Sequence, residues 1–188
     1  MANEFELLAK LFRYPTEGYL HDVVRSFEAL AAGGDQIIEP LAKFFEQVRS
    51  LTVKDLQVLY TATFDLDPVC SLEVGWHLFG ENYERGEFLV RMRGELRRLG
   101  VKESTELPDH LSHALEALDR MEPEEAADFA AACLAPALDK MIAGIKGKSN
   151  LFENLLLVAT QLLELRYGRS TAATGSVEPF RILNSEGW

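Results

Sequence analysis

Apolar residues recur along most of this chain at intervals of three and four, which places them on one face of an α-helix. The first stretch with this spacing covers residues 5–12. Similar stretches follow at residues 16–30, 40–48, 52–64, 82–99, 111–118, 123–142 and 150–167. No segment alternates apolar and polar residues as a half-buried strand would. The pattern therefore predicts an all-α fold, a single-domain bundle of about eight or nine helices.

Capping residues and helix breakers support these boundaries. Thr52, followed three residues later by Asp55, has the spacing of a helix N-terminus whose two side chains bond each other's backbone. Pro123 suits the first turn of a helix, where no hydrogen bond from its nitrogen is needed. Pro136 lies inside an apolar pattern, and we expect it to kink or split that helix.

Two segments differ from this amphipathic pattern. Residues 150–167 are apolar on nearly all sides, which predicts a position in the middle of the bundle. Residues 168–188 show little periodicity. We therefore expect a helical domain over residues 1–167 and a loosely ordered tail over residues 168–188.

One helix carries a charged face. Within residues 82–99, Glu87 and Arg91 are four residues apart, and Glu95 and Arg98 are three apart. Such pairs on a helix contribute only tenths of a kcal/mol each. We expect all four side chains to be solvated surface rather than part of a site.

The charge balance limits the possible partners. Among 188 residues, 19 lysines and arginines against 30 aspartates and glutamates give a net charge of −11. Proteins that bind nucleic acid usually carry a basic patch, so we expect no nucleic-acid partner. An acidic surface suits a cationic partner, although it more often serves only to keep a protein soluble. Cys70 and Cys133 form no CxxC pair, and we expect both to be buried and reduced.

The ends of the chain predict a cytoplasmic protein without stable membrane insertion. The first ten residues, MANEFELLAK, have no basic segment followed by an apolar core, so they do not resemble a secretory signal. The longest apolar run near the C-terminus, residues 155–159, is far shorter than the roughly 20 residues of a membrane span. We expect a monomer or a weak dimer.

Residues 60–80 combine aromatic and acidic side chains between two helical patterns. Pro68 should end the first helix, and Ser71 should cap the second with its hydroxyl. The aromatic and acidic residues of this stretch and just beyond it are Tyr60, Phe64, Asp65, Asp67, Glu73, Trp76, Phe79 and Glu81. Such a mixture suits a groove for a peptide that is partly basic and partly apolar. The spacing alone slightly favours the alternative, in which the aromatic residues are core and the acids cap helices.

Motifs of common enzyme classes are absent from the sequence, which contains no GxGxxG, GxSxG or HExxH. His110 and His113 have a spacing that could hold a metal ion, but two histidines without a third ligand are weak support. A metal-dependent helical-bundle enzyme using these residues, His77 and nearby carboxylates remains an alternative. A generic helical peptide-binding adaptor is another. We expect no catalytic residue, no bound metal and no cofactor.

A series of short motifs extends through the middle of the chain. They are Phe64-Asp65, Ser71-Leu72, His77 with Phe79-Gly80-Glu81, Arg85-Gly86, and Glu106-Leu107-Pro108-Asp109-His110-Leu111. Together they resemble the NarJ/TorD type of redox-enzyme maturation chaperone. The most similar group is the nitrate reductase assembly chaperones, also called delta subunits. The resemblance covers about residues 5–167, and the ELPDHL motif is its most specific part.

The resemblance implies an all-helical, non-catalytic chaperone. Members of the family bind the N-terminus of a molybdopterin oxidoreductase catalytic subunit, often a twin-arginine signal. They hold the apo-subunit for cofactor insertion before export or membrane docking. By this resemblance and the local chemistry, we expect the client peptide to contact Tyr60, Phe64, Asp65, Asp67, Ser71, Leu72, Trp76, His77, Phe79, Glu81, Arg85, Pro108, Asp109 and His110. The client enzyme and any direct contact with the molybdenum cofactor are left open.

The ELPDHL motif, residues 106–111, also predicts local structure. We expect Leu107 and Leu111 to be buried, with Pro108 and Asp109 forming a turn. Asp109 should lie near the N-terminal end of the following helix, where its negative charge is stabilised.

Overall fold

The computed structural model describes residues 4–31 and 38–168. Within these ranges the chain forms α-helices and short 3₁₀- and π-helical turns, and its only β-type pairing is a single bridge between Glu73 and His110. The predicted all-α fold is confirmed. None of the described helices combines the length and apolar character needed to cross a membrane. Residues 169–188 of the predicted tail lie outside the described residues, so the division at residue 167 stays a prediction.

The described residues form a series of helices joined by short connections. The α-helices are α1 (Glu4–Leu11), α2 (Tyr19–Ala31), α3 (Ile38–Val48), α4 (Val53–Tyr60), α5 (Val74–Phe79), α6 (Tyr83–Arg98), α7 (Leu111–Leu118), α8 (Pro123–Phe129), α9 (Ala135–Ile145) and α10 (Leu151–Tyr167). A π-helical turn, Thr61–Asp65, and a 3₁₀ turn, Pro68–Cys70, connect α4 to α5. A second π-helical turn, Ala130–Leu134, joins α8 to α9.

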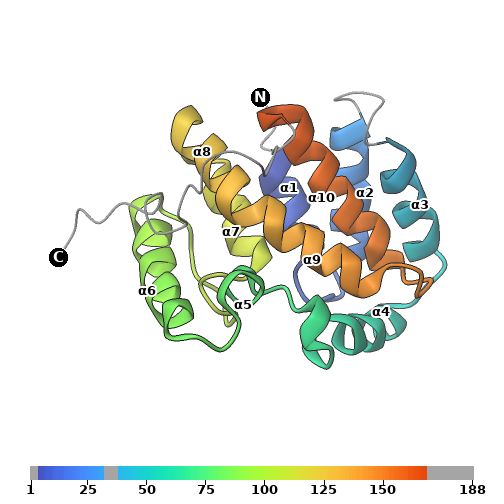
Figure 1. The fold of residues 1–188 in the computed structure, drawn as a ribbon. Coiled ribbons are helices and arrows are strands. Elements are labelled where there is room, and N and C mark those ends of the chain that lie inside the picture. Colours follow the sequence, from blue (N-terminus) through green and yellow to red (C-terminus); the bar gives the residue numbers. More distant parts are fainter. Residues whose placement is uncertain (1–3, 32–37, 169–188) are drawn as a thin grey trace.

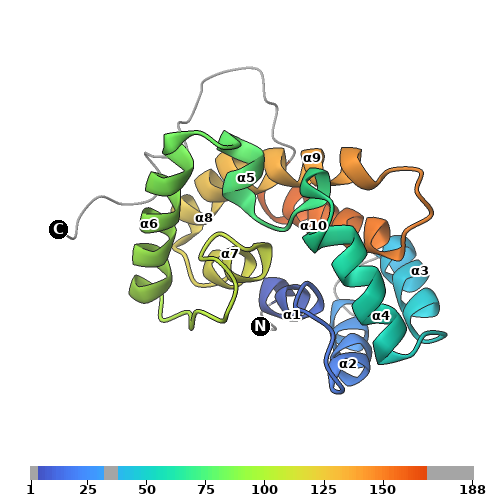
Figure 2. The same cartoon turned by 90° about the horizontal axis from the view of Figure 1, so that it is seen from below.

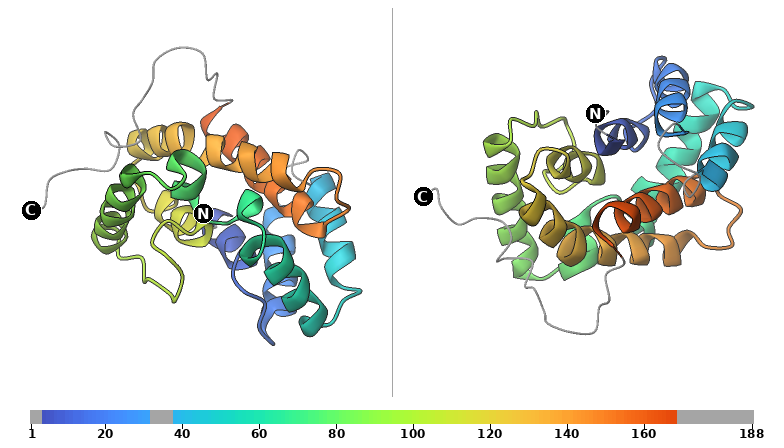
Figure 3. Two further views of the ribbon diagram at one scale, coloured as in Figure 1. Left: turned by 60° about the horizontal axis from the view of Figure 1, so that its bottom comes forward. Right: turned by 90° about the horizontal axis from the view of Figure 1, so that it is seen from above.

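The helix α10 lies in the middle of the bundle, as its apolar sequence predicts. It packs against α3 and α9, while α1 packs against α7 and α2. Most of its length is buried, from Leu151 to Leu163. In Figures 1 and 3 the helix α6 lies at one end of the molecule and α3 at the other, with α9 and α10 crossing between them.

Several local predictions are confirmed. Thr52 Oγ1 accepts a hydrogen bond from the Asp55 N–H (3.2 Å), and Asp55 Oδ2 accepts one from the Thr52 N–H (3.0 Å). Pro123 occupies the first turn of α8. Pro136 is the second residue of α9, and a π-helical turn interrupts the α-helical hydrogen bonding just before it, between α8 and α9.

The segment after Pro68 differs from its prediction. Ser71 does not cap a helix, because α5 begins only at Val74. The residue that caps here is Asp67, whose Oδ1 accepts a hydrogen bond from the Val69 N–H (3.1 Å) at the start of the 3₁₀ turn. Ser71 Oγ instead accepts a bond from the Glu73 N–H (3.3 Å). Glu73, the residue before α5, is extended because it pairs with His110 in a distant segment.

That distant segment is residues 109–111. The Val74 N–H donates to the Asp109 carbonyl (3.0 Å), and the Leu111 N–H donates to the Leu72 carbonyl (2.7 Å). The Asp109 carboxylate then accepts a bond from the Gly75 N–H (2.8 Å). These three bonds attach the start of α5 to the start of α7.

The ELPDHL motif is therefore arranged differently from the prediction. Leu111 is fully buried, but Leu107 is 39% exposed. Asp109 is buried and bonds the start of α5, so it does not serve α7. His110 caps α7, with Nδ1 accepting a bond from the Ser112 N–H (3.3 Å). The predicted turn at Pro108 and Asp109 is present and is closed by the His110 N–H, which donates to the Leu107 carbonyl (3.0 Å), but the motif also joins two helices.

One charged residue of α6 was wrongly placed on the solvated surface. The Glu95 side chain is only 4% exposed. It pairs with Arg98, whose Nη2 lies 2.7 Å from Glu95 Oε2. The predicted ion-pair spacing is confirmed, but its carboxylate end is buried while the Arg98 side chain is 42% exposed.

Gly75→Ala tests how closely Asp109 approaches α5. A methyl group at this position would lie 2.8 Å from Asp109 Oδ2 and 2.9 Å from Phe88 Cδ1. Because such overpacking forces its neighbours to move, we expect the free energy of unfolding in urea to fall by about 1–3 kcal/mol.

Gly94→Ala on α6 is the matched control, because its methyl group would meet no atom within 4 Å. Alanine inside a helix should raise the free energy of unfolding by about 0.5–1 kcal/mol. If the two substitutions had the same effect, the close approach at Gly75 would be wrong.

Candidate functional site

A pocket of about 430 Å³ opens where α4, α5, α6 and the start of α7 meet, and its elements can be followed in Figure 2. Its volume is within the range of small-ligand sites. The residues that line it are Tyr60, Phe64, Asp65, Pro68, Ser71, Leu72, Glu73, Trp76, Arg85, Glu106 and His110. They come from segments that are up to 50 residues apart in the sequence.

The pocket brings together many of the residues predicted to bind a peptide. Those on its lining are Tyr60, Phe64, Asp65, Ser71, Leu72, Trp76, Arg85 and His110. Those outside its lining are Asp67, His77, Phe79, Glu81, Pro108 and Asp109. Peptide binding by either group stays a prediction.

One wall of the pocket is aromatic. Tyr60 ends α4, and Phe64 lies in the π-helical turn, with ring centroids 5.0 Å apart. Phe152 of α10 supports Phe64 from within the core, at 4.8 Å between centroids. Asn150, at the start of α10, donates from Nδ2 to Thr63 Oγ1 (2.6 Å). The wall is thus fixed to the central helix of the bundle.

Hydrogen bonds hold the two polar groups of this wall. The Tyr60 hydroxyl donates to the Phe12 carbonyl (2.9 Å) and lies 3.5 Å from His110 Nε2. Burial, with smaller effects of His113 and Arg13, lowers the pKa of His110 to about 3. Burial, aided by Glu106 and Asp65, raises the pKa of Tyr60. Both side chains are therefore neutral near pH 7 and present little charge to a ligand.

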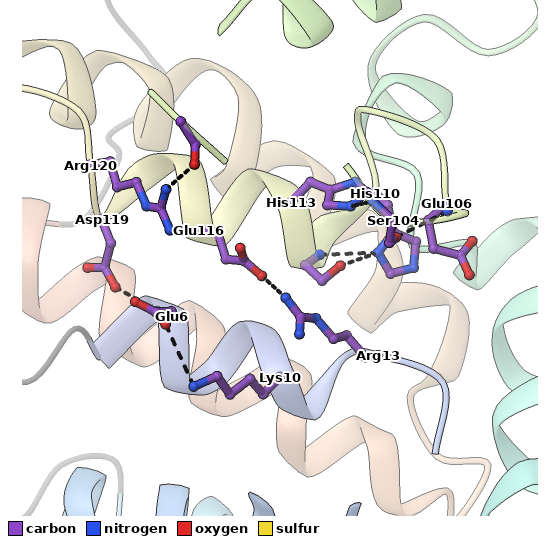
Figure 4. A network of polar contacts seen from close by, with 12 residues as sticks. Glu6, Lys10, Arg13, Ser104, Glu106, His110, His113, Glu116, Asp119 and Arg120 are labelled. Carbon is purple, nitrogen blue, oxygen red and sulfur yellow. Dashed lines mark hydrogen bonds and ion pairs between the residues drawn. The ribbon is translucent and has the colours of Figure 1, made fainter. Parts of the chain in front are cut away.

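Contacts between α1 and α7 lie behind His110, and Figure 4 shows them. Arg13 forms an ion pair with the buried carboxylate of Glu116. Asp119 Oδ2 accepts a hydrogen bond from the Glu6 N–H (2.6 Å) at the start of α1. Because Arg13 follows Phe12, the same contacts hold the carbonyl that receives the Tyr60 hydroxyl.

The opposite wall carries the charged groups. Arg85 Nη2 lies 2.7 Å from Glu73 Oε2, and its guanidinium carbon is 5.3 Å from the centroid of the Trp76 ring. The indole N–H of Trp76 donates to the Pro68 carbonyl (2.8 Å). These contacts fix one cation against an aromatic face.

The pocket carries excess negative charge. Asp65 and Glu106 are exposed, and neither forms an ion pair with another described residue. With Glu73 they make three carboxylates against the single guanidinium of Arg85, a net charge of two negative charges on the lining. Such a lining favours a cationic group on a ligand and repels an anionic one.

Three lining residues were not predicted as contacts. Glu106 lies in the ELPDHL motif and Pro68 in the stretch of residues 60–80, so both motifs pointed to the region. The third, Glu73, belongs to the acidic residues of the stretch that suggest a peptide groove, but it is not among the predicted peptide contacts. Its pairing with Arg85 joins residues on two helices, and no local spacing in the sequence reveals it.

Two predicted contacts that lie off the pocket have clear structural roles. Asp67 pairs with Lys148 (3.1 Å), which holds the pKa of its carboxyl below the ordinary value. His77 is buried, and its Nε2 bonds the Ser71 carbonyl (2.6 Å). Burial is the main cause that lowers the pKa of His77.

The others are placed as follows. Phe79 packs on Phe88, with 5.4 Å between ring centroids. Pro108 and Asp109 are buried beneath the pocket region, and Glu81 is exposed on the turn before α6.

The histidines considered as metal ligands have hydrogen-bond partners on the backbone. His113 Nε2 accepts a bond from the Ser104 N–H (3.0 Å), and its Nδ1 donates to the Leu107 carbonyl (2.9 Å). Both ring nitrogens of His113 therefore fix the loop before α7. In residues 4–31 and 38–168 no three His, Cys, Asp or Glu side chains are grouped as metal ligands.

Comparison with known proteins identifies the family. The model of the family described as "Nitrate reductase delta subunit" matches residues 27–151, about two thirds of the chain. The chain belongs to the nitrate reductase delta subunit family. The predicted resemblance to NarJ-type chaperones is thereby confirmed.

Curated relatives of this delta subunit family are similar over most of the chain. The nitrate reductase molybdenum cofactor assembly chaperone NarJ of Escherichia coli (strain K12) is 27% identical over 169 residues, which are 86% of this chain and 71% of that protein. A NarJ relative assigned to the same role in Bacillus subtilis (strain 168) is 32% identical over 115 residues, covering 60% of this chain and 62% of that one. Both are named as chaperones rather than enzymes, in agreement with the prediction of a non-catalytic protein.

A solved structure supports the fold of the delta subunit family. The crystal structure of a protein assigned as a redox enzyme maturation protein of Archaeoglobus fulgidus aligns with a TM-score of 0.64 at 24% identity. The alignment covers 87% of this chain and 94% of that one. It shows that the two proteins share the same overall helical fold.

Asp109→Asn tests the buried carboxyl beneath the pocket. Burial raises the pKa of Asp109 from 3.8 to about 6, although the Gly75 N–H partly opposes this. As the pH falls through about 6, the folded protein takes up a proton that the unfolded chain does not yet bind, so the wild type gains stability. The asparagine keeps an oxygen for the Gly75 N–H but has no such proton.

The measurement is urea unfolding of both proteins. Between about pH 8 and about pH 5 we expect the wild type to gain about 1–2 kcal/mol relative to Asp109→Asn. His110, with its lowered pKa, makes a contribution of opposite sign, but it is present in both proteins and cancels. A stability difference that does not change with pH would show that Asp109 is ionised throughout.

Proposed function

We propose that this chain is an assembly chaperone for a nitrate-reductase-like molybdopterin oxidoreductase. It binds the N-terminal, twin-arginine-type segment of the catalytic subunit and holds the apo-subunit in the cytoplasm until the molybdenum cofactor is inserted. Family membership and the names of the curated relatives support the role in assembly. The pocket is the observation that supports peptide binding.

The pocket offers both kinds of contact that such a peptide needs. Tyr60 and Phe64 belong mostly to the core, with 3% and 4% of their surface exposed, so they offer an apolar side chain only their edges; the excess negative charge can receive arginine. At its edge Leu66 and Val69 are 74% and 58% exposed, and they are neighbours in sequence of lining residues Asp65 and Pro68. Exposed apolar side chains beside an acidic pocket extend the surface available to the apolar part of the peptide.

Typical free energies indicate how much charged and apolar contacts each contribute to peptide binding. Exposed ion pairs contribute about 0.2–1 kcal/mol each. Apolar surface contributes about 25 cal/mol per Å² removed from water, so a few hundred Å² outweigh several ion pairs. Because Tyr60 and Phe64 are only 3% and 4% exposed, we expect the exposed apolar side chains at the pocket edge to provide most of the affinity, while the carboxylates set orientation and association rate.

The test is calorimetry and stopped-flow binding with a synthetic peptide that has two consecutive arginines followed by an apolar segment. The pocket variant is Asp65→Asn with Glu106→Gln. Asp67, also predicted as a peptide contact, is left unchanged because its carboxylate pairs with Lys148. We expect affinity to fall about three- to tenfold, with slower association and a weaker dependence on salt.

The control removes the same two kinds of charge elsewhere. Glu124→Gln with Asp128→Asn changes one glutamate and one aspartate, both exposed on α8 and outside the pocket. This variant should bind the peptide as the wild type does. Equal affinity, rate and salt dependence in all three proteins would mean that the peptide binds elsewhere.

A further inference from the structure

Arg85 is the one cation on the lining of the pocket, and its surroundings hold it rigidly. Its Nη2 pairs with Glu73, and its guanidinium lies over the Trp76 ring. The side chain is 23% exposed. Trp76 is itself held through its indole N–H. A guanidinium fixed on two sides keeps its remaining N–H groups in set directions.

One of those groups has no acceptor. Nε of Arg85 is buried and has no hydrogen-bond partner among the described residues. A buried donor without a partner carries a free-energy cost, and a ligand that supplies an acceptor removes it. Arg85, a residue of the pocket lining, therefore carries a donor without an acceptor.

The two unpaired carboxylates of the lining belong to another part of the pocket. Asp65 follows Phe64 in the π-helical turn, and Glu106 precedes the ELPDHL turn. Phe64 packs on Tyr60, whereas Glu73 pairs with Arg85 over the Trp76 ring. The pocket is thus divided into an acidic end near Tyr60 and an arginine end near Trp76.

We propose that the pocket binds one basic residue of the client peptide in a fixed direction, with its side chain at Asp65 and Glu106 and a main-chain carbonyl oxygen of the same segment at Nε of Arg85. This rests on the proposed function, since it specifies how the peptide lies. The acceptor is a neutral carbonyl rather than a carboxylate, because Arg85 is already paired with Glu73 and the lining as a whole carries excess negative charge, which repels an anion. An extended segment of a peptide supplies a basic side chain and a carbonyl within one residue of each other, so it meets both requirements.

The experiment is a set of double-mutant cycles by calorimetry. The probe is the synthetic peptide with two consecutive arginines and an apolar segment, made with single carbonyl oxygens replaced by sulfur, a weaker acceptor. At one position we expect the thioamide to weaken binding to the wild type about fivefold, the effect of one hydrogen bond. With Arg85→Lys, which keeps the charge but lacks Nε, the same thioamide should change affinity less than about twofold.

A second cycle tests the acidic end. Replacing one arginine of the peptide by citrulline, which has nearly the same shape but no charge, should weaken binding to the wild type. The same replacement should have little effect on binding to the protein with Asp65→Asn and Glu106→Gln. The coupling of one arginine to this end and of one carbonyl to Arg85 together define the direction of the peptide.

Controls separate these couplings from effects on folding. Arg93→Lys, on the same helix and paired with Glu103 away from the pocket, should respond to every peptide as the wild type does. Thermal unfolding of each variant is measured alongside. If Arg85→Lys lowers the folded fraction, Arg85→Met, which keeps an unbranched chain beside Trp76, replaces it in the cycle.

The outcomes distinguish the inference from the function on which it rests. If the unmodified peptide binds the wild type but either coupling is absent, the proposed direction is wrong and peptide binding stands. If the unmodified peptide does not bind the wild type, both the direction and the peptide-binding function are wrong.

Discussion

The pairing of residues 72–74 with residues 109–111 is the interaction on which the pocket depends. Two backbone hydrogen bonds and the Asp109 carboxylate attach the start of α5 to the start of α7. Glu73 and His110, which form the bridge, both line the pocket. If this pairing were lost, the position of the arginine end relative to the aromatic wall would no longer be fixed. A contact between segments more than 30 residues apart thus determines the geometry of the site.

This arrangement has an energetic cost at Asp109. Burial raises the pKa of its carboxyl, which means that the ionised group destabilises the fold near neutral pH. The Gly75 N–H offsets part of this cost, and the absence of a side chain at Gly75 permits the short distance. An apolar residue at position 109 would avoid the burial of charge but would leave the Gly75 N–H without this acceptor. The buried Asp109 carboxylate thus lowers stability, while its bond to the Gly75 N–H holds α5 and α7 in one register.

The sequence predicts the helices well and the site only in part. Helices depend on residues that are close in the sequence, whereas the site depends on contacts between distant segments. The capping pair Thr52 and Asp55 and the split before Pro136 depend on residues within one or two turns, so local spacing predicts them. The role of Ser71 and the exposure of Leu107 depend on the distant pairing, and both predictions failed. The motifs led to the correct region of the chain. Which of their side chains face the pocket is decided by contacts that no spacing in the sequence records.

The two ends of the pocket differ in how much freedom they lose on binding. Tyr60, Trp76 and Arg85 are already held by hydrogen bonds or an ion pair, so a ligand would order them little further. Asp65 and Glu106 are exposed and without ion pairs among the described residues, so fixing them costs side-chain entropy that offsets much of the gain of an exposed ion pair. The rigid end should therefore contribute more to the choice of peptide direction than its single charge suggests. The acidic end should mainly raise the association rate, because its negative charge attracts a cationic segment before contact is made.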